Sequence, residues 1–180
     1  MKMVKGLVVA GLAAALLAGC GSNSDNSAAN TNKPAEQTDA TTTASIVNQA
    51  DAFTSAVSEK GTWIIAILDD LTVDKDVVVA GEFHDKNDAS KDIYRKIALY
   101  AQDEDHNVTA SYTLTVPKLT VQSENLRIQG GTVKGDVYVE ANGFNLYENS
   151  TIDGNLYFAN ADVQATAKID GKVTGATEVK

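Results

Sequence analysis

Two segments of the chain are near-copies of each other, and this repeat limits the folds open to the chain more than any other feature. The first reads TVKGDVYVEAN from Thr132 and the second TIDGNLYFAN from Thr151, a spacing of 19 residues (from 132 to 151). Glycine aligns with glycine, tyrosine with tyrosine, and apolar residues with apolar residues. A weaker third copy, KIDGKV, brings Ile169, Gly171 and Val173 into the same columns 17 residues further on (from 152 to 169).

A period of about 17 to 20 residues, with short strands between Gly, Asn and Asp turns, is too short for helical repeats, which need roughly 33 residues or more. One such period cannot bury its apolar side alone. Coils stacked about 4.8 Å apart share backbone hydrogen bonds and build a continuous core. The repeat therefore predicts an all-β fold, a parallel β-helix. An antiparallel β-sandwich with a duplicated hairpin is the alternative.

Before the repeat, the sequence predicts a short helix. Ile46, Ala50, Phe53 and Val57 recur at helical spacing, and Ser45 precedes them as a candidate N-cap. A helix with this apolar face would cover the open edge of the first coil, which otherwise invites strand addition.

Several segments between the helix and the repeat read as strands. They are TWIIAIL, LTV, DVVVAGEFH and VTASYTLTV, and Pro117 is expected to end the last one. Residues 93–101 fit a strand or a short helix equally well. Glycine is scarce in this region, so we expect longer or decorated coils.

The amino terminus has the form of a secretion signal. Lys2 and Lys5 precede an apolar run over residues 7–17, which is too short for a membrane-spanning helix. The sequence LAGC that follows resembles the lipobox of bacterial lipoproteins, in which the cysteine carries diacylglycerol and the peptide is cut just before it. The resemblance implies a signal peptide over residues 1–19, lipid attachment at Cys20 and an extracytoplasmic, membrane-anchored protein. A plain signal peptide with an incidental thiol is the alternative.

The composition of residues 20–44 differs from that of the rest of the chain after the predicted signal peptide. Residues 20–44 contain no aromatic residue, Leu, Ile or Val, so they cannot bury enough apolar surface to offset the entropy lost on ordering. Their composition therefore predicts a flexible tether. Residues 45–180 have the length of one domain. Cys20 is the only cysteine, which excludes an intramolecular disulfide. The formal net charge of −9 disfavours nucleic acid as a partner.

Two equivalent tyrosines suggest a ligand platform. Tyr138 and Tyr157 lie between inward-facing apolar residues, so both rings are expected to point outward and to stack on adjacent coils. Asp136, Asn155 and Glu140 are close enough in sequence to hydrogen-bond sugar hydroxyls beside such a ladder. The alternative is that the paired rings only stabilise neighbouring strands.

Two acidic loops contain the only histidines of the chain. FHDKND and QDEDHN would bring together His84, Asp85, Asp103, Asp105 and His106 if the loops meet, and these side chains could bind a divalent cation. Two separate, solvated loops are the alternative. The chain contains no GxSxG, HExxH or P-loop motif, and neither a catalytic residue nor a cofactor is predicted.

The repeat region resembles two groups of parallel β-helix proteins: the secreted, pectate-lyase-like polysaccharide enzymes and the short-coil, polymer-forming bactofilins. These resemblances and the lipobox imply a non-enzymatic binding or structural protein of the cell envelope, with a glycan or an envelope protein as partner. A polysaccharide-active enzyme is the alternative function. Self-association through the last strand, over residues 173–179, is a further expected interaction.

Overall fold

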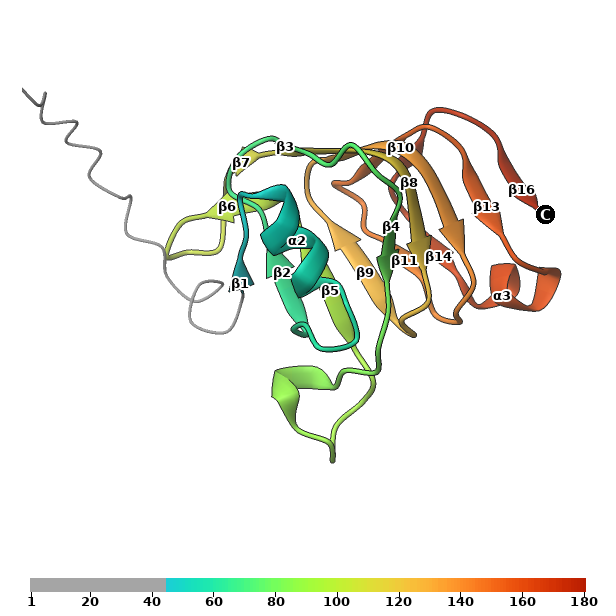
Figure 1. Cartoon of the computed structure of the whole chain (residues 1–180), viewed down its shortest axis with the longest axis horizontal. Helices are drawn as coiled ribbons and strands as arrows, with labels where there is room; N and C mark the ends of the chain where they lie inside the picture. The colour runs from blue at the N-terminus through green and yellow to red at the C-terminus, as the bar shows by residue number, and fades with distance from the viewer. Residues whose placement is uncertain (1–44) are drawn as a thin grey trace, which may run out of the picture. The chain divides into compact units, whose positions relative to one another are not determined.

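A computed structural model describes residues 45–180 as a predominantly β structure with few, short helices (Figure 1). The predicted signal peptide, Cys20 and the predicted tether lie outside these residues. No helix in the described part of the chain is long and apolar enough to cross a membrane. The helical elements are α2 (Ala50–Ala56), the 3-10 turn η1 (Asp85–Asn87) and α3 (Ala161–Thr166).

The strands form two large sheets and one small one. The six-stranded sheet has the order β1 (Ser45–Ile46), β2 (Ile64–Ala66), β5 (Arg95–Ala98), β9 (Leu126–Gln129), β11 (Asn145–Leu146) and β14 (Lys168–Ile169). The eight-stranded sheet contains β3 (Leu71–Thr72), β4 (Val77–Val79), β8 (Thr113–Val121), β10 (Thr132–Val139), β12 (Thr151–Asp153), β13 (Leu156–Phe158), β15 (Lys172–Val173) and β16 (Thr177–Val179). A separate pair is formed by β6 (Tyr100–Gln102) and β7 (Val108–Ser111).

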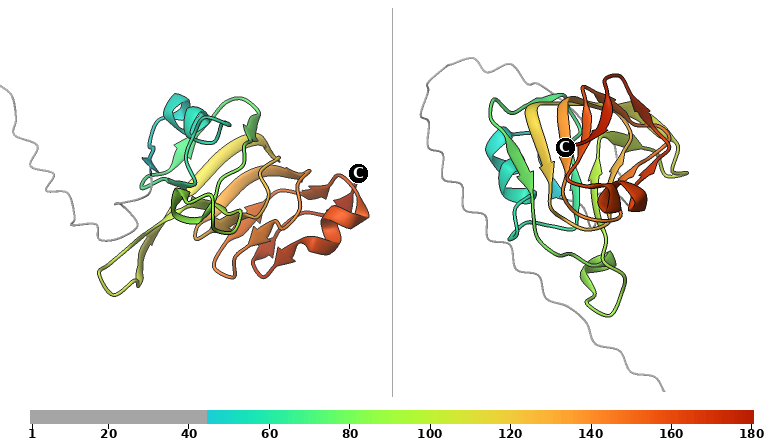
Figure 2. Two further views of the ribbon diagram at one scale, coloured as in Figure 1. Left: turned by 90° about the horizontal axis from the view of Figure 1, so that it is seen from below. Right: turned by 90° about the vertical axis from the view of Figure 1, so that its right-hand side faces the viewer.

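All strand pairs in the two large sheets are parallel, and the chain alternates between these sheets as it runs from β8 to β16. The antiparallel β-sandwich that we considered is therefore wrong. The β6–β7 hairpin is antiparallel, as is an isolated bridge between His84 and Ile93. The hairpin and the loop that contains η1 both project from the sheets (Figure 1; Figure 2).

The register confirms the alignment of the first two repeat copies. Thr132 pairs with Thr151, and Tyr138 with Tyr157. Gly135 lies at a bulge, where β10 passes the Val116–Pro117 step of β8. Its φ of 138° is strained for any residue with a Cβ, and such an atom would overlap the backbone oxygen of Val116. Pro117 thus lies within β8 and does not end the strand.

The predicted third repeat copy is wrong. Ile152 pairs with Val173, whereas Ile169 pairs with Leu146 in the other sheet. The true third copy, KVTGATEV, lies 21 residues after the second, as the hydrogen bond from the Ala176 nitrogen to Asn155 Oδ1 shows. Helix α3 lengthens this period, and the true copy has Thr177 and Glu178 where the second copy has Leu156 and Tyr157.

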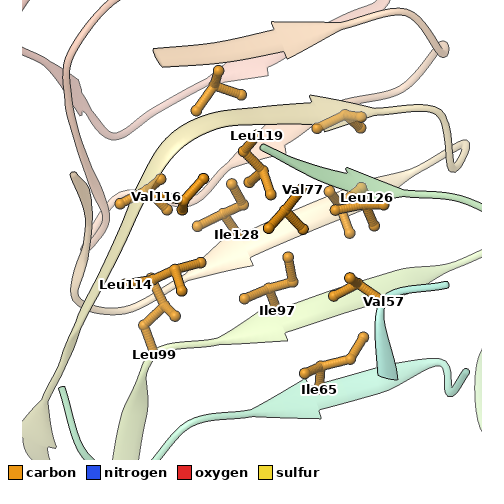
Figure 3. Close-up of a cluster of buried hydrophobic side chains, with 14 of the residues drawn as sticks. Val57, Ile65, Val77, Ile97, Leu99, Leu114, Val116, Leu119, Leu126 and Ile128 are labelled. Carbon is orange, nitrogen blue, oxygen red and sulfur yellow. The ribbon is translucent and has the colours of Figure 1, made fainter. Parts of the chain in front are cut away.

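Apolar side chains from both large sheets form one continuous core. The alternation of buried and exposed positions along β4, β9 and the second half of β10 sends every second side chain inward. Figure 3 shows Ile97 and Ile128 from one sheet pointing into the same interior as Leu114 and Leu119 from the other, and all four are fully buried. Burial of each such side chain contributes roughly 1.5–3 kcal/mol to folding.

The predicted helix forms, but it is shorter than expected at its start. Ser45 and Ile46 belong to β1, where Ser45 pairs with Ile65, and Gln49 is the N-cap. Pairing with β2 satisfies backbone groups that a longer helix would leave to water. The helix buries Phe53 completely in the core, as its apolar spacing predicted.

The structure also describes residues 93–101, which the sequence left open between strand and helix, and the last two strands of the chain. Residues 93–101 contain strand β5 and the beginning of β6 and no helix. At the carboxyl-terminal side, β15 and β16 are the outermost strands of their sheet, and Val179 is 44% exposed.

Candidate functional site

The predicted tyrosine ladder forms, but most of it is not exposed. The ring centroids of Tyr138 and Tyr157 lie 4.6 Å apart, with an angle of 45° between the ring planes. Tyr157 is only 8% exposed, and the ammonium of Lys180 lies 3.6 Å from its ring centroid. A ligand could reach only the half-buried Tyr138, so the pair serves mainly to join β10 to β13.

The polar residues predicted beside the ladder bond within the fold. Asp136 Oδ1 accepts hydrogen bonds from the backbone nitrogen of Asn155 at 2.9 Å and from its Nδ2 at 3.0 Å. Glu140 Oε2 accepts a hydrogen bond from Gln122 Nε2 at 2.9 Å. Asp136 and Asn155 thus connect successive turns between strands, which leaves them few free hydrogen-bonding groups for a ligand.

The predicted metal site does not form. Within residues 45–180, no group of three or more His, Cys, Asp or Glu side chains could hold a metal ion. His84 and Asp85 lie in the loop after β4, whereas Asp103, Asp105 and His106 lie at the β6–β7 turn, and Figure 1 shows these two excursions apart.

Local hydrogen bonds engage the polar groups of both loops. Asp103 Oδ1 accepts hydrogen bonds from the backbone nitrogens of Asp105 and Asn107, which closes the hairpin turn. His84 Nδ1 lies 2.7 Å from the Lys91 carbonyl oxygen, and this contact raises the pKa of His84 above its ordinary value. Each loop therefore satisfies its own polar groups.

A cleft of about 760 Å³ lies between the η1 loop and the start of β9. Its lining residues are Asp85, Lys91, Asp92, Ile93, Tyr94 and Asn125. The loop is fastened to the sheet by the hydrogen bond that Asn125 Nδ2 donates to the Ile93 carbonyl oxygen at 3.0 Å. We call this space the Tyr94 cleft. It combines an aromatic ring with carboxylates, an ammonium and an amide, which is a set of groups suited to a polyhydroxylated ligand.

The outer surface of the six-stranded sheet carries cations next to the Tyr94 cleft. Ile97 and Ile128 are fully buried in the core, so their strand neighbours Lys96 and Arg127 point to the opposite face. Lys96 pairs in register with Arg127, which pairs with Asn145. We call the surface formed by Lys96, Arg127 and Asn145 the Lys96–Arg127 face.

Tyrosine rings position both cations. The Arg127 guanidinium carbon lies 5.6 Å from the ring centroid of Tyr94 and 5.3 Å from that of Tyr147. Lys96 Nζ lies 3.3 Å from the hydroxyl of Tyr100 and 5.7 Å from its ring centroid. Because Tyr94 also lines the cleft, the cleft and the Lys96–Arg127 face share a side chain.

Sequence reasoning missed this region. The sequence left residues 93–101 open between a strand and a short helix. The strands that contain Lys96 and Arg127 are also separated in the chain by the β6–β7 hairpin and β8, so nothing in the sequence indicated that they are neighbours. In comparisons with protein-family models, curated proteins and solved structures, no match to the chain was found.

Proposed function

We propose that this chain is an extracytoplasmic lipoprotein, anchored to a bacterial membrane through Cys20, whose domain is a parallel β-helix that binds a glycan without cleaving it. The parallel pairing in both large sheets and the alternation of the chain between them support the β-helix. The LAGC sequence supports the anchor, since the two acyl chains of a diacylglycerol group hold a protein stably to a bilayer.

The Tyr94 cleft is the observation that carries glycan binding. A cleft of about 760 Å³ falls within the usual size range of ligand sites. The ring of Tyr94 offers a flat apolar surface, while Asp85, Asp92 and Asn125 offer acceptors and donors for hydroxyl groups. Glycans present this combination of apolar ring faces and hydroxyls.

A binding screen of the full-length chain in detergent against cell-wall and extracellular polysaccharides tests the proposal. We expect Tyr94→Ala to weaken binding at least 10-fold. Tyr138→Ala is the matched control, because it removes a half-buried tyrosine from the other sheet and should leave binding unchanged. If the chain retains no glycan at all, or if both variants bind as the wild type does, the Tyr94 cleft is not a glycan site.

One feature of the cleft favours the alternative of a polysaccharide-active enzyme. Asp85 and Asp92 both line it, and cleavage of glycosidic bonds commonly uses a pair of carboxylates. Asp85 Oδ2 lies 3.9 Å from Lys91 Nζ. We expect a retained glycan to be recovered intact after long incubation. New chain ends that disappear in Asp85→Asn and Asp92→Asn would instead establish the enzyme.

The anchor has its own test. Growth of the producing cells with a labelled fatty acid should label the wild-type protein and not Cys20→Ser, and the variant should leave the membrane fraction. Equal labelling of both proteins, or an unlabelled wild type, would exclude lipid attachment at Cys20.

A further inference from the structure

We propose that the Lys96–Arg127 face binds the anionic group of an acidic sugar, so that the glycan ligand of this chain carries carboxylate or phosphate. This inference rests on the proposed glycan-binding function and adds the charge class of the ligand. The argument depends on three observations: unbalanced positive charge, an arginine held in position, and the neighbouring cleft.

The positive charge on this face has no counter-charge in the fold. Lys96 and Arg127 are direct partners on adjacent strands, and like charges in such positions repel each other. Among residues 45–180, neither side chain is within ion-pair distance of a carboxylate. Burial lowers the pKa of Lys96, and the charge of Arg127 lowers it further. A bound anion would offset the repulsion and the burial of both cations.

The nearest polar partners of Lys96 are neutral. Its Nζ lies 3.3 Å from the Tyr100 hydroxyl and 3.4 Å from Gln129 Oε1, both long for bonds from an ammonium. Lys168, which pairs with Asn145 in the next register position, differs from Lys96, because its Nζ lies 2.9 Å from the Asp170 carboxylate. The missing counter-charge is thus specific to Lys96 and Arg127 within this column.

Arg127 is positioned before any ligand arrives. Tyr94 and Tyr147 flank its guanidinium, whose planar donors match the oxygens of a carboxylate or phosphate. Its Nε is buried and has no hydrogen-bond partner, and the same holds for Asn145 Oδ1 in the adjacent register position. Unpaired buried polar atoms are rare in folded proteins. The Arg127 donor is one that an anion could satisfy, whereas the Asn145 oxygen is an acceptor that a hydroxyl group could satisfy.

The Lys96–Arg127 face lies beside the Tyr94 cleft. Tyr94 contacts Arg127 and lines the cleft, so a sugar in the cleft could place an acidic substituent near the guanidinium. The chain as a whole has a formal net charge of −9, which would repel an acidic polymer elsewhere on its surface. The two unbalanced cations therefore mark a place where such a polymer can bind beside the cleft.

The test uses the full-length chain in detergent with four probes: a glucuronate-containing oligosaccharide, glucose 1-phosphate, inorganic phosphate and a neutral gluco-oligosaccharide. Trp63 is the only tryptophan of the chain, and its ring centroid lies 6.1 Å from that of Tyr94, so its fluorescence reports on the region. Calorimetry provides the affinities. The glucuronate and phosphate arms distinguish the two sources of negative charge.

The variants are Lys96→Gln and Arg127→Gln. Lys118→Gln is the matched control, because Lys118 also lies over a tyrosine, with Nζ 5.6 Å from the ring centroid of Tyr138, but it is on the other sheet and is paired with Asp76 at 3.0 Å. We expect each site variant to bind the acidic sugar at least 10-fold more weakly and the control to bind it as the wild type does. Added salt should weaken wild-type binding.

Thermal unfolding without ligand distinguishes a binding role of Lys96 from a purely structural one, because loss of a structural residue would lower the melting temperature. Neutralisation of Lys96 should leave the melting temperature unchanged or raise it, because a repelled and partly buried cation is removed. The acidic sugar should raise the melting temperature of the wild type and not that of either site variant.

Two results would overturn the inference, and they differ in what they say about the proposed function. Equal binding of neutral and acidic sugars, unaffected by Lys96→Gln and Arg127→Gln, would refute the anion site while glycan binding stands. Retention of no sugar by the wild type would refute both.

Discussion

Arg95 is a buried cation that has no carboxylate partner among residues 45–180, and its removal should destabilise the domain strongly. It is 0% exposed. Its guanidinium lies 4.1 Å from the ring centroid of Phe83 and donates hydrogen bonds to five oxygens. These belong to the carbonyls of Ala56, Ser58, Thr62 and Ala80 and to the hydroxyl of Ser123. Because Ala56 and Ser58 lie at the end of α2, Arg95 joins that helix to the two large sheets.

Arg95→Met keeps an unbranched apolar side chain and removes all the donors. Each buried acceptor left unpaired costs about 1–3 kcal/mol. The contact with the Ala56 carbonyl is fully buried, whereas those with the carbonyls of Ser58, Thr62 and Ala80 are only part-buried, so water can replace some of them. Removal of the charge opposes this loss, because burial lowers the pKa of Arg95 to about 10 and so penalises the charged guanidinium. We expect a net loss of about 3 kcal/mol.

Arg95→Lys should be at least as destabilising as Arg95→Met, because a lysine keeps a buried charge with three donors in place of five. Urea unfolding followed by circular dichroism measures both variants, with an unchanged slope as the sign that only stability has changed. Substitutions at the protein surface usually change stability by less than about 0.5 kcal/mol. A loss as small as that for Arg95→Met, or wild-type stability of Arg95→Lys, would refute the conclusion that these hydrogen bonds are the main contribution of Arg95.

Three further predictions concern single positions. Gly154→Ala should lower the free energy of unfolding by about 1–3 kcal/mol in urea titrations, because its Cβ would overlap the backbone oxygen of Gly135; wild-type stability would contradict the tight stacking of this corner. Asn160→Ala removes the cap of α3 and should cost about 1 kcal/mol in the same assay, with no loss as the refuting result. The contact with the Lys91 carbonyl raises the pKa of His84, so its stabilisation of the η1 loop should be present below about pH 6.5 and lost as the pH rises through the raised pKa; limited proteolysis across this range should show the change, and a pH-independent rate would refute it.

The sequence by itself determined the parts of the fold that depend on local pattern. Alternation of apolar and polar residues predicted strands and their inward faces, because successive side chains on a strand point in opposite directions. The matching phrases from Thr132 and Thr151 predicted the correct register, because equivalent residues of the two phrases pair with each other on adjacent parallel strands. The apolar spacing of Phe53 and Val57 predicted the helix that enters the core.

Other features were decided only when distant segments came together. The register of the third repeat copy depended on α3. Because this helix is inserted before the copy, Val173 pairs with Ile152, and Ile169 lies in the other sheet. The low exposure of Tyr157 depended on the pairing of β13 with β16. In both cases the decisive residues lie after the second copy, where the repeat pattern is weaker.

The candidate sites were decided by tertiary structure for the same reason. The two histidine loops satisfy their own polar groups and lie apart, although their composition suggested a metal site. Lys96 and Arg127 are neighbours because β5 and β9 pair across an intervening hairpin and strand. Local pattern reports which way a side chain points, whereas the partner it meets depends on how many residues the chain inserts before it returns to the same sheet.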